Sequence, residues 1–198
     1  MQFSLFGAAA IEPSRADLDG LLLAGAQWVR SGSTDLSRAD VPAERARLSI
    51  LVAPGWRAPA LVEELARREL DGEVAQAEGG LITVRTPFRS DLVAPARRWT
   101  RGALTAPPPG LVLSPGGLRL WAIAAGRMAD AGYLLGTSAL DHPTHRAAGA
   151  QLAAVGLAAV SVGGRGGPGW RITGIKRVRR LGELLGEAPD GAGRDWPA

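Results

Sequence analysis

The sequence predicts an α+β protein made of two related halves, and three observations support this fold class. Some segments place apolar residues at helical spacing, whereas others alternate or cluster them as strands do, with glycine and proline between the segments. The order of these elements repeats along the chain. A length of 198 residues also suits two small halves that share one hydrophobic core.

The first half, 15–101, is expected to alternate helices with strands. Ser14 is suited to cap the first helix, and Leu18, Leu21 and Leu22 form its apolar stripe. The expected elements are a helix over 15–28, a turn or weak strand with a loop over 31–44, a strand over 47–53, a helix over 58–70, a hairpin of 73–77 with 81–86, and a helix over 90–101.

A proline-rich linker is expected over 102–117, because its composition suits neither a helix nor a strand. The second half follows over 118–187, and the last residues, 188–198, are expected to form a tail. The expected elements of the second half are a helix over 118–125, a strand over 132–137, a helix over 143–155, a hairpin of 159–163 with 170–174, and a helix over 175–185.

The second half repeats the element order of the first half with nearly equal spacing. The strand segment 48–51 (LSIL) aligns with 133–136 (YLLG), and the segment 81–86 (LITVRT) aligns with 169–174 (GWRITG). Such a repeat implies two units related by a pseudo-two-fold axis. We therefore expect a monomer whose two halves meet like the subunits of a dimer.

Basic residues are numerous, and nearly all of them are arginine. The chain holds 23 Lys and Arg against 19 Asp and Glu, and Lys176 is its single lysine. Arginine keeps its charge at any working pH and binds phosphate through paired hydrogen bonds, which favours nucleic acid as a partner. The alternative is compositional, because chains rich in Ala, Gly, Pro and Arg are typical of GC-rich genomes. Charge alone leaves both interpretations open.

The sequence has the features of a cytoplasmic protein. It has no cysteine, which excludes disulfides, thiolate metal sites and cysteine nucleophiles. No apolar run approaches the roughly 20 residues that cross a bilayer, and the first residues lack the basic region of a signal peptide. We therefore expect a cytoplasmic chain without a membrane segment.

The opening helix of each half carries a similar pattern. Residues 18–26 read LDGLLLAGA, and residues 118–126 read LRLWAIAAG. With the order of elements over roughly residues 15–187, this pattern resembles the LAGLIDADG homing endonucleases, and in particular the degenerate LAGLIDADG domain of WhiA-type sporulation regulators. The resemblance implies two αββαββα-like repeats whose strands form a saddle for duplex DNA. The helix-turn-helix domain of WhiA-type regulators is not expected, because the chain ends near the point where that domain would begin.

The resemblance also implies a metal site in its catalytic members. An acidic residue from each motif helix there binds a divalent metal ion over the phosphates to be cleaved. The matching positions in this chain are Gly25 and Ala125, whose side chains cannot bind a metal ion. The nearby acids Asp19 and Asp130 fall at other positions of the pattern. We therefore expect no catalytic residue, no metal, no cofactor and no nuclease activity.

The two motif helices of the resembled fold pack side by side, which requires small residues at their contact. Gly20 and Ala24 meet this requirement on one face of the first helix. In the second helix Ala124 is small, whereas Leu120 is not.

Arginines on strands and turns are the candidates for DNA contact, since strands form the implied saddle. Because side chains alternate between the two faces of a strand, some candidates are expected to point elsewhere. Phosphate contacts by arginine would give affinity without choice of sequence. The candidates are Arg30, Arg47, Arg85, Arg127, Arg165 and Arg171.

Several other features have a structural as well as a functional interpretation. His142 and His145 are spaced for metal binding, but the start of a helix explains them equally. The glycine-rich segment 163–169 lacks the residues of a phosphate loop and suits a hairpin tip. The cationic segment 176–180 suits either a solvated helix face or a contact with a nucleic-acid backbone. Trp28, Trp99 and Trp121 are expected in the core, whereas Trp56, Trp170 and Trp196 are candidates for exposure and base stacking.

The function that these features favour is non-catalytic binding of double-stranded DNA, in transcriptional or chromosome-associated regulation. The alternative is a protein–protein interaction module that uses the saddle or the basic helices. A metal-dependent endonuclease is the third interpretation, and it requires metal ligands that the motif helices lack.

Overall fold

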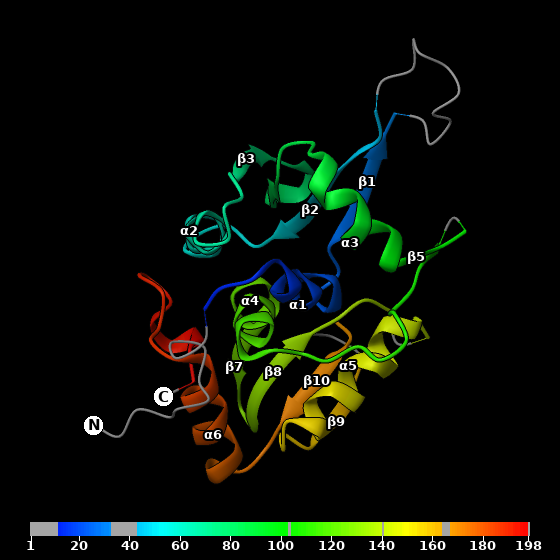
Figure 1. Cartoon of the computed structure of the whole chain (residues 1–198). Helices are drawn as coiled ribbons and strands as arrows, with labels where there is room; N and C mark the ends of the chain where they lie inside the picture. The colour runs from blue at the N-terminus through cyan, green and yellow to red at the C-terminus, as the bar shows by residue number, and fades with distance from the viewer. Residues whose placement is uncertain (1–11, 33–42, 103, 140, 164–166, 198) are drawn as a thin grey trace.

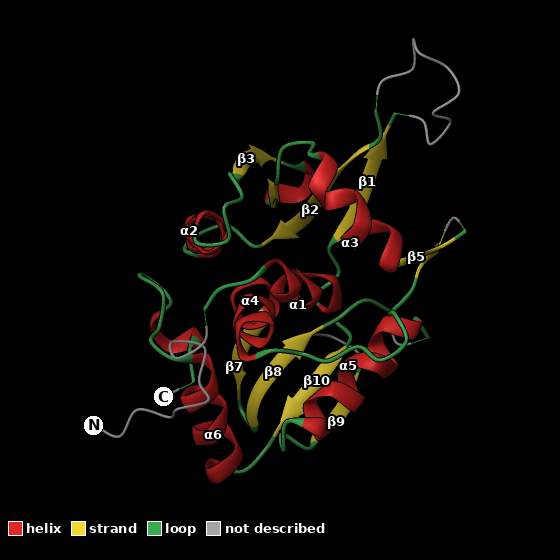
Figure 2. Cartoon of the chain, viewed as in Figure 1, coloured by secondary structure: helices red, strands yellow, loops and turns green. Residues whose placement is uncertain are grey.

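The computed structural model describes residues 12–32, 43–102, 104–139, 141–163 and 167–197. These residues include two four-stranded antiparallel sheets, with two helices packed against each other at the centre of the molecule (Figure 1). Figure 2 shows one sheet above the central helices and the other below them. The protein therefore has the α+β architecture that the sequence predicts.

The elements of the first half are η2 (Arg15–Asp17), α1 (Leu18–Leu23), β1 (Gln27–Ser31), β2 (Arg45–Val52), α2 (Arg57–Ala66), β3 (Glu73–Gln76), η3 (Glu78–Gly80), β4 (Ile82–Arg85), η4 (Ser90–Leu92) and α3 (Val93–Arg98). Their strands form one sheet in the order β1-β2-β4-β3. Within β2, Ala46, Leu48, Ile50 and Val52 are buried, whereas the residues between them are more exposed. This alternation indicates a sheet with one face covered by helices and one face open.

The elements of the second half are α4 (Pro115–Ala125), β7 (Gly126–Ala129), β8 (Gly132–Gly136), α5 (Pro143–Ala154), β9 (Ala159–Val162), β10 (Gly169–Ile172), α6 (Ile175–Leu185) and η5 (Gly193–Asp195). The strands form a second sheet in the order β7-β8-β10-β9, which repeats the order of the first sheet. A small ladder of β5 (Thr100–Arg101) and β6 (Leu104–Thr105) lies between the halves along the chain.

The register of the two sheets confirms the predicted alignment of 48–51 with 133–136. The predicted alignment of 81–86 with 169–174 is wrong by two residues, because Arg85 and Arg171 hold the equivalent places. Ser49 of β2 pairs with Gln27 on one side and with Arg85 on the other. Leu134 of β8 pairs with Arg127 and with Arg171 in the same way. Ser49 and Leu134 are therefore equivalent positions of the repeat, as their alignment in the sequence indicates.

The first helix is shorter than the sequence predicts, and a helix end through Trp28 is wrong. α1 ends at Leu23, and Gly25 follows with a φ of 104°, a conformation that few residues other than glycine adopt. The chain then enters β1, where Trp28 pairs with Leu48 and is half-buried. The apolar character of Trp28 therefore reflects the covered face of a strand, which helical spacing alone does not reveal.

The predicted linker and tail both contain packed structure. α4 begins at Pro115, inside the expected linker, because the Ser114 hydroxyl caps the helix by accepting a hydrogen bond from Gly117 N at 2.9 Å. Near the C-terminus, Trp196 is only 7% exposed, and its Nε1 donates to the carbonyl oxygen of Gly186 at 3.0 Å. Its ring meets Trp56 edge-on at 6.3 Å. The expectation of an exposed Trp196 is therefore wrong.

The two halves share one hydrophobic core, and their central contact depends on glycine. A Cβ atom added to Gly20 of α1 would overlap the carbonyl oxygen of Gly117 of α4. The prediction of a small residue at Gly20 is confirmed, but its neighbour on α4 is Gly117 rather than Ala124 or Leu120. Trp99 and Trp121 are fully buried in the same core, as predicted.

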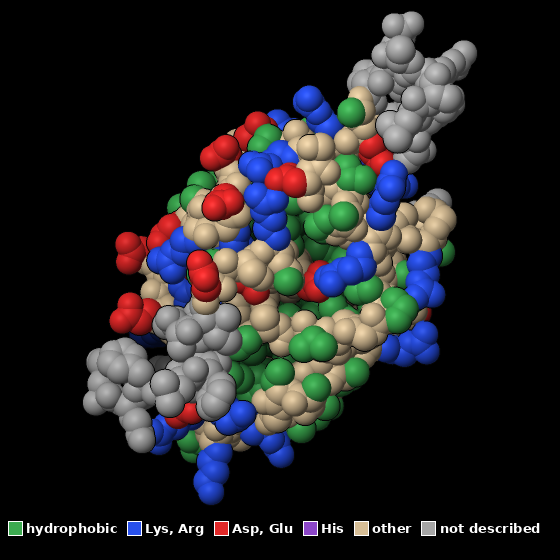
Figure 3. Space-filling view, viewed as in Figure 1, with side chains coloured by type: hydrophobic (Ala, Val, Ile, Leu, Met, Phe, Trp, Pro, Cys, Tyr) green, Lys and Arg blue, Asp and Glu red, His purple; other side chains and the backbone are tan. Residues whose placement is uncertain are grey.

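Charged side chains of both signs cover much of the first half on the face drawn in Figure 3. Among the described residues, no helix combines the length and the apolar character that crossing a membrane requires.

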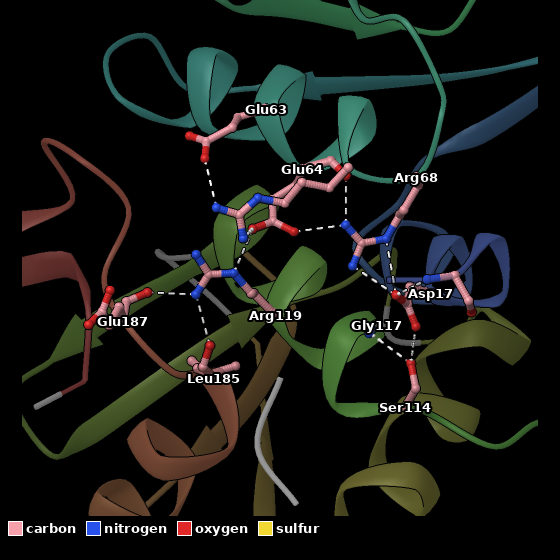
Figure 4. A network of polar contacts seen from close by, with 11 residues as sticks. Asp17, Glu63, Glu64, Arg68, Ser114, Gly117, Arg119, Leu185 and Glu187 are labelled. Carbon is pink, nitrogen blue, oxygen red and sulfur yellow. Dashed lines mark hydrogen bonds and ion pairs between the residues drawn. The ribbon is translucent and has the colours of Figure 1, made fainter. Parts of the chain in front are cut away.

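A chain of buried ion pairs also joins the halves (Figure 4). Asp17 Oδ2 accepts from Arg68 Nη2 at 2.8 Å, and Arg68 Nη1 donates to Glu64 Oε2 at 2.7 Å. Glu64 Oε1 accepts from Arg119 Nε of α4 at 2.7 Å. Burial acts to raise the pKa of Glu64, but the hydrogen bonds from Arg119 and Arg68 outweigh burial and lower this pKa below its usual value. We call these four residues the ion-pair chain.

Candidate nucleic-acid interface

Cross-strand pairing places one row of side chains across the open face of each sheet. Directly paired residues project from the same face, so the position of one residue fixes the face of its partners. The first row contains Gln27, Ser49, Arg85 and Glu73. The second row contains Arg127, Leu134, Arg171 and Val160. The two rows occupy equivalent places in the repeat.

The open face of the first sheet carries three arginines. Arg85 lies in the first row and donates from Nε to Glu73 Oε2 at 3.0 Å. Arg47 is half-buried, with its guanidinium carbon 4.6 Å from the centre of the Phe88 ring. Arg45 is exposed at the start of β2. Since Arg45, Arg47 and Ser49 alternate with buried residues, all three side chains project from the open face.

The open face of the second sheet brings two arginines together. Arg127 and Arg171 are the direct cross-strand partners of Leu134, one on each side of it. Leu134 is only 6% exposed, although it lies on the open face. Directly opposed strand positions bring side chains close together, so the two arginines flank this buried leucine. Two positively charged side chains therefore lie on either side of an apolar residue on this face.

The structure does not place two of the predicted arginines on the open faces. Arg30 pairs with Ala46, which is buried, so Arg30 projects from the helix-covered face of the first sheet. Its Nη1 lies 3.3 Å from Glu44 Oε1, and Glu44 also pairs with Arg97 of α3. The expectation that Arg30 belongs to the saddle surface is therefore wrong. Arg165 lies outside the described residues. Arg45 was not among the candidates, because the predicted strand began at position 47, although the alternation already includes position 45.

The ends of the two motif helices contain no metal-binding side chain. Gly25 follows α1 directly, and a Cβ atom added there would lie 3.8 Å from Ser138 Oγ. Ala125 is the last residue of α4. Asp19 is occupied elsewhere, since it accepts from Trp99 Nε1 at 2.7 Å and pairs with Arg98.

Asp130 follows β7, whose four residues span roughly 13 Å from the end of α4. Within the part of the chain that the structure describes, no group of three or more His, Cys, Asp or Glu side chains is arranged to hold a metal ion. A divalent metal therefore does not fit the residues present at the helix ends.

The two histidines have structural partners. His142 Nδ1 accepts from Thr144 N at 3.2 Å and so caps α5. His145 is buried and shares hydrogen bonds with Thr137 Oγ1 at 2.7 Å and with Ser161 Oγ at 2.8 Å. Burial lowers the pKa of His145. These contacts favour the interpretation of the pair as the start of a helix.

Trp170 and Trp56 are also engaged inside the molecule. The Trp170 ring stacks on His145 at 4.9 Å, and its Nε1 donates to the carbonyl oxygen of His145 at 2.9 Å. Trp56 is half-buried between Trp196 and Arg57, whose guanidinium carbon lies 4.6 Å from its ring centre. Both rings contribute to packing, so neither of them offers a fully exposed face on which a base could stack.

Two solved structures share this fold. The N-terminal LAGLIDADG domain of DUF199/WhiA aligns with a TM-score of 0.53 at 13% identity, over 87% of this chain and 82% of that chain. The homing endonuclease I-WcaI, solved bound to its DNA recognition sequence, aligns with a TM-score of 0.57 at 10% identity, over 96% of this chain and 89% of that chain. No protein-family model matches the chain. No curated protein shows a significant match.

These likenesses establish the class of fold. Two tandem units, a pair of central helices and two four-stranded sheets of the same order define a LAGLIDADG-like fold. The resemblance inferred from the sequence is therefore confirmed at the level of the fold.

Proposed function

We propose that this chain binds duplex DNA on the open faces of its two sheets and does not cleave it. The observation that carries the proposal is the equivalent placement of Arg85 and Arg171, one on each sheet, at the same position of the repeat. Two cations related by a pseudo-two-fold axis match the two strands of a duplex, which are themselves related by two-fold axes. I-WcaI, whose structure contains its DNA recognition sequence, supports DNA as the ligand.

The arginines of the open faces supply affinity rather than choice of sequence. Each phosphate that an arginine neutralises releases counterions, so binding weakens as salt rises. Arg45, Arg47, Arg85, Arg127 and Arg171 provide this charge on the two open faces. Contacts that read base edges require further donors and acceptors.

We place the protein among regulators or chromosome-associated proteins of the cytoplasm, rather than among nucleases. The absence of acidic side chains at Gly25 and Ala125 supports this part of the proposal, because metal-assisted cleavage needs oxygen ligands next to the phosphate. A protein that holds DNA without cutting it acts by occupying a site, bending the duplex or recruiting a partner.

A fluorescence-anisotropy titration with a mixed-sequence duplex, at several salt concentrations, tests DNA binding. We expect salt-sensitive binding whose logarithmic slope falls by about one unit when Arg171 is replaced by alanine. Arg30→Ala is the matched control, since Arg30 is an exposed strand arginine on the other face. Absence of binding at low salt, or an equal loss with Arg30→Ala, contradicts the proposal.

A cleavage assay tests the absence of nuclease activity. The duplex is incubated with the protein and Mg²⁺, or with the protein and Mn²⁺, and strand breaks are followed on a denaturing gel. We expect intact DNA with both ions. Cleavage that persists through purification and disappears on addition of EDTA overturns this part of the proposal.

A further inference from the structure

A groove beside α6 combines exposed apolar side chains with positive charge. It lies between the β7–β8 turn and the start of α6, and its volume is about 570 Å³. Met128, Ala131, Ile175, Val178 and Arg179 line it, together with two glycines. Ile175 is 89% exposed and Met128 is 41% exposed. Single exposed apolar residues are common, but here several converge on one hollow.

Two apolar side chains of the groove, Met128 and Ile175, are exposed, whereas Val178 also packs against the core. α6 buries Leu181, Leu184 and Leu185 against the rest of the molecule, and these leucines anchor the helix. Ile175 lies at the first position of α6, outside the turns that these leucines occupy. The folded protein therefore leaves part of the apolar surface of the groove exposed to solvent. Exposed apolar surface of this kind is typical of a binding site.

One cation, Arg179, lines the groove, and further cations lie on the same helix. Lys176, Arg177, Arg179 and Arg180 are all exposed. Arg179 Nε lies 3.6 Å from Glu183 Oε1, and Arg177 donates to the carbonyl oxygen of Thr173 at 3.3 Å. Figure 3 shows Lys and Arg side chains gathered at the lower end of the molecule, where Figure 1 places α6. Glu183 and the exposed Asp130 of the β7–β8 turn only partly offset this charge.

The groove lies on the opposite side of the second sheet from the proposed DNA interface. Met128 pairs with Tyr133, which is buried on the helix side, whereas the preceding residue, Arg127, pairs with Leu134 on the open face. Neighbouring residues of one strand point to opposite faces. A duplex on the open face therefore leaves the groove accessible, and the two surfaces are able to work independently.

We propose that this groove binds an acidic, amphipathic segment of another protein. Its apolar side chains would fill the hollow between Met128, Ile175 and Val178, and its carboxylates would face the cations of α6. A nucleic-acid backbone would not contact the apolar side chains of the groove favourably, since phosphate binding needs charge and hydrogen-bond donors. A membrane surface is disfavoured because the main apolar stripe of α6 is buried.

Fluorescence anisotropy with a labelled peptide tests the proposal. The probe has about 12 residues, mostly Glu and Ala, with Leu at positions i, i+4 and i+7 to form one apolar stripe. A second peptide replaces each Leu by Ser and keeps the charge. We expect the first peptide to bind and the second to bind at least tenfold more weakly, because the hollow needs an apolar anchor.

Two protein variants locate the peptide. Ile175→Ser should weaken binding of the leucine peptide about tenfold, whereas Val112→Ser, at another site that is 80% exposed, should not change it. Arg179→Glu should weaken binding severalfold at low salt, in contrast with Arg146→Glu on α5. Ile175 and Arg179 are both exposed, so these substitutions leave the core intact.

The outcomes separate this inference from the proposed DNA function. Arg171→Ala should leave peptide binding unchanged, and Ile175→Ser should leave DNA binding unchanged. Equal binding of the serine peptide, or no effect of Ile175→Ser, overturns the proposal. It is also overturned when the leucine peptide does not bind. Binding of duplex DNA or of anionic lipid vesicles that Ile175→Ser abolishes would then identify a different ligand for the groove.

Discussion

The two sheets share strand order and register, yet their open faces differ in chemistry. In the first row Arg85 is held by Glu73, so its charge is matched within the row. In the second row Arg127 and Arg171 flank Leu134, and Val160 occupies the place of the carboxylate. The difference indicates that Arg85 and Arg171, although they hold equivalent places, are expected to contribute unequally to the proposed binding of a duplex.

The covered faces of the two sheets are more alike than the open faces. Leu48 and Ile50 of β2 are matched by Tyr133 and Leu135 of β8, and all four are buried. Close packing restricts the residues that fit a core, whereas an open face tolerates many. The two halves therefore resemble each other more at their buried positions, where packing restricts the residue type, than at their exposed positions.

The largest expected effect concerns the ion-pair chain, which both halves share. Asp17→Ala leaves Arg68 buried with only part of its charge matched, since both side chains are at most 4% exposed. We expect a loss of about 3–5 kcal/mol in the free energy of unfolding. Urea unfolding followed by circular dichroism measures this loss, and both halves should unfold in a single transition.

Glu63→Ala is the control for that experiment. It breaks the exposed pair of Glu63 with Arg67, which should cost no more than about 0.5 kcal/mol. If Asp17→Ala costs as little as Glu63→Ala, the buried pair of Asp17 with Arg68 adds no more stability than an exposed ion pair.

The next effect concerns the glycine contact between α1 and α4. Gly20→Ala would place a methyl group on the carbonyl oxygen of Gly117, and we expect a destabilisation of about 3 kcal/mol. At an uncrowded helix position the same change stabilises by up to about 1 kcal/mol, so the sign is informative. The thermal unfolding midpoint is the measurement. An increase in this midpoint shows that the helices lie further apart than described.

Low pH should weaken the ion-pair chain, because Glu64 becomes protonated. Its pKa is lowered in the folded state, so its contribution is present above the unfolded carboxyl pKa of about 4.3 and is lost as pH falls through the folded value. Glu64→Gln should therefore cost about 2 kcal/mol at neutral pH and progressively less below about pH 4. Urea unfolding at a series of pH values measures this, and a pH-independent difference contradicts it.

The two arginines at equivalent positions should contribute unequally to DNA binding. Arg171→Ala should weaken binding about tenfold at low salt, and Arg85→Ala only about threefold, because Arg85 already bonds Glu73. Anisotropy titrations of both variants on one duplex give the comparison. Equal losses mean that the two sheets bind the duplex alike despite their different rows.

The smallest expected effect is a gain in DNA affinity when the carboxylate that pairs with Arg85 is removed. Glu73→Gln removes the carboxylate that holds Arg85, so DNA affinity should rise about twofold to threefold at low salt and return to the wild-type value at high salt. The double variant Glu73→Gln with Arg85→Ala should lose this gain. A gain that survives the loss of Arg85 reflects general charge rather than release of that arginine.

Much of the architecture was predictable because local patterns agreed with the tertiary structure. The alternation in 47–53 and the alignment of Ser49 with Leu134 predicted β2 and β8 in the correct relation. The helix predicted through Trp28 failed, because the turn at Gly25 and the pairing of β1 with β2 overrode its apolar spacing. β7 follows α4 directly and was not predicted, since its four residues form too short a pattern.

The candidate interface was predictable only in part. Arg47, Arg85, Arg127 and Arg171 were named from the sequence and lie on the open faces. Arg30 carries the same residue type on a strand but faces α3, because its position in the register with Ala46 decides the face. No local signal gives that register when the strand itself is not recognised.

The sequence by itself determined the repeat, the α+β class and the absence of acidic side chains at Gly25 and Ala125, since these depend on residue type and spacing along the chain. The tertiary structure alone decided which arginines share a face, that Gly117 meets Gly20, and that Trp196 packs against Trp56. The physical reason is that a side chain's neighbours across strands and between helices are set by pairing and packing over long sequence separations. Local sequence patterns specify the helices and strands, whereas burial and strand register determine which of their faces are exposed to solvent.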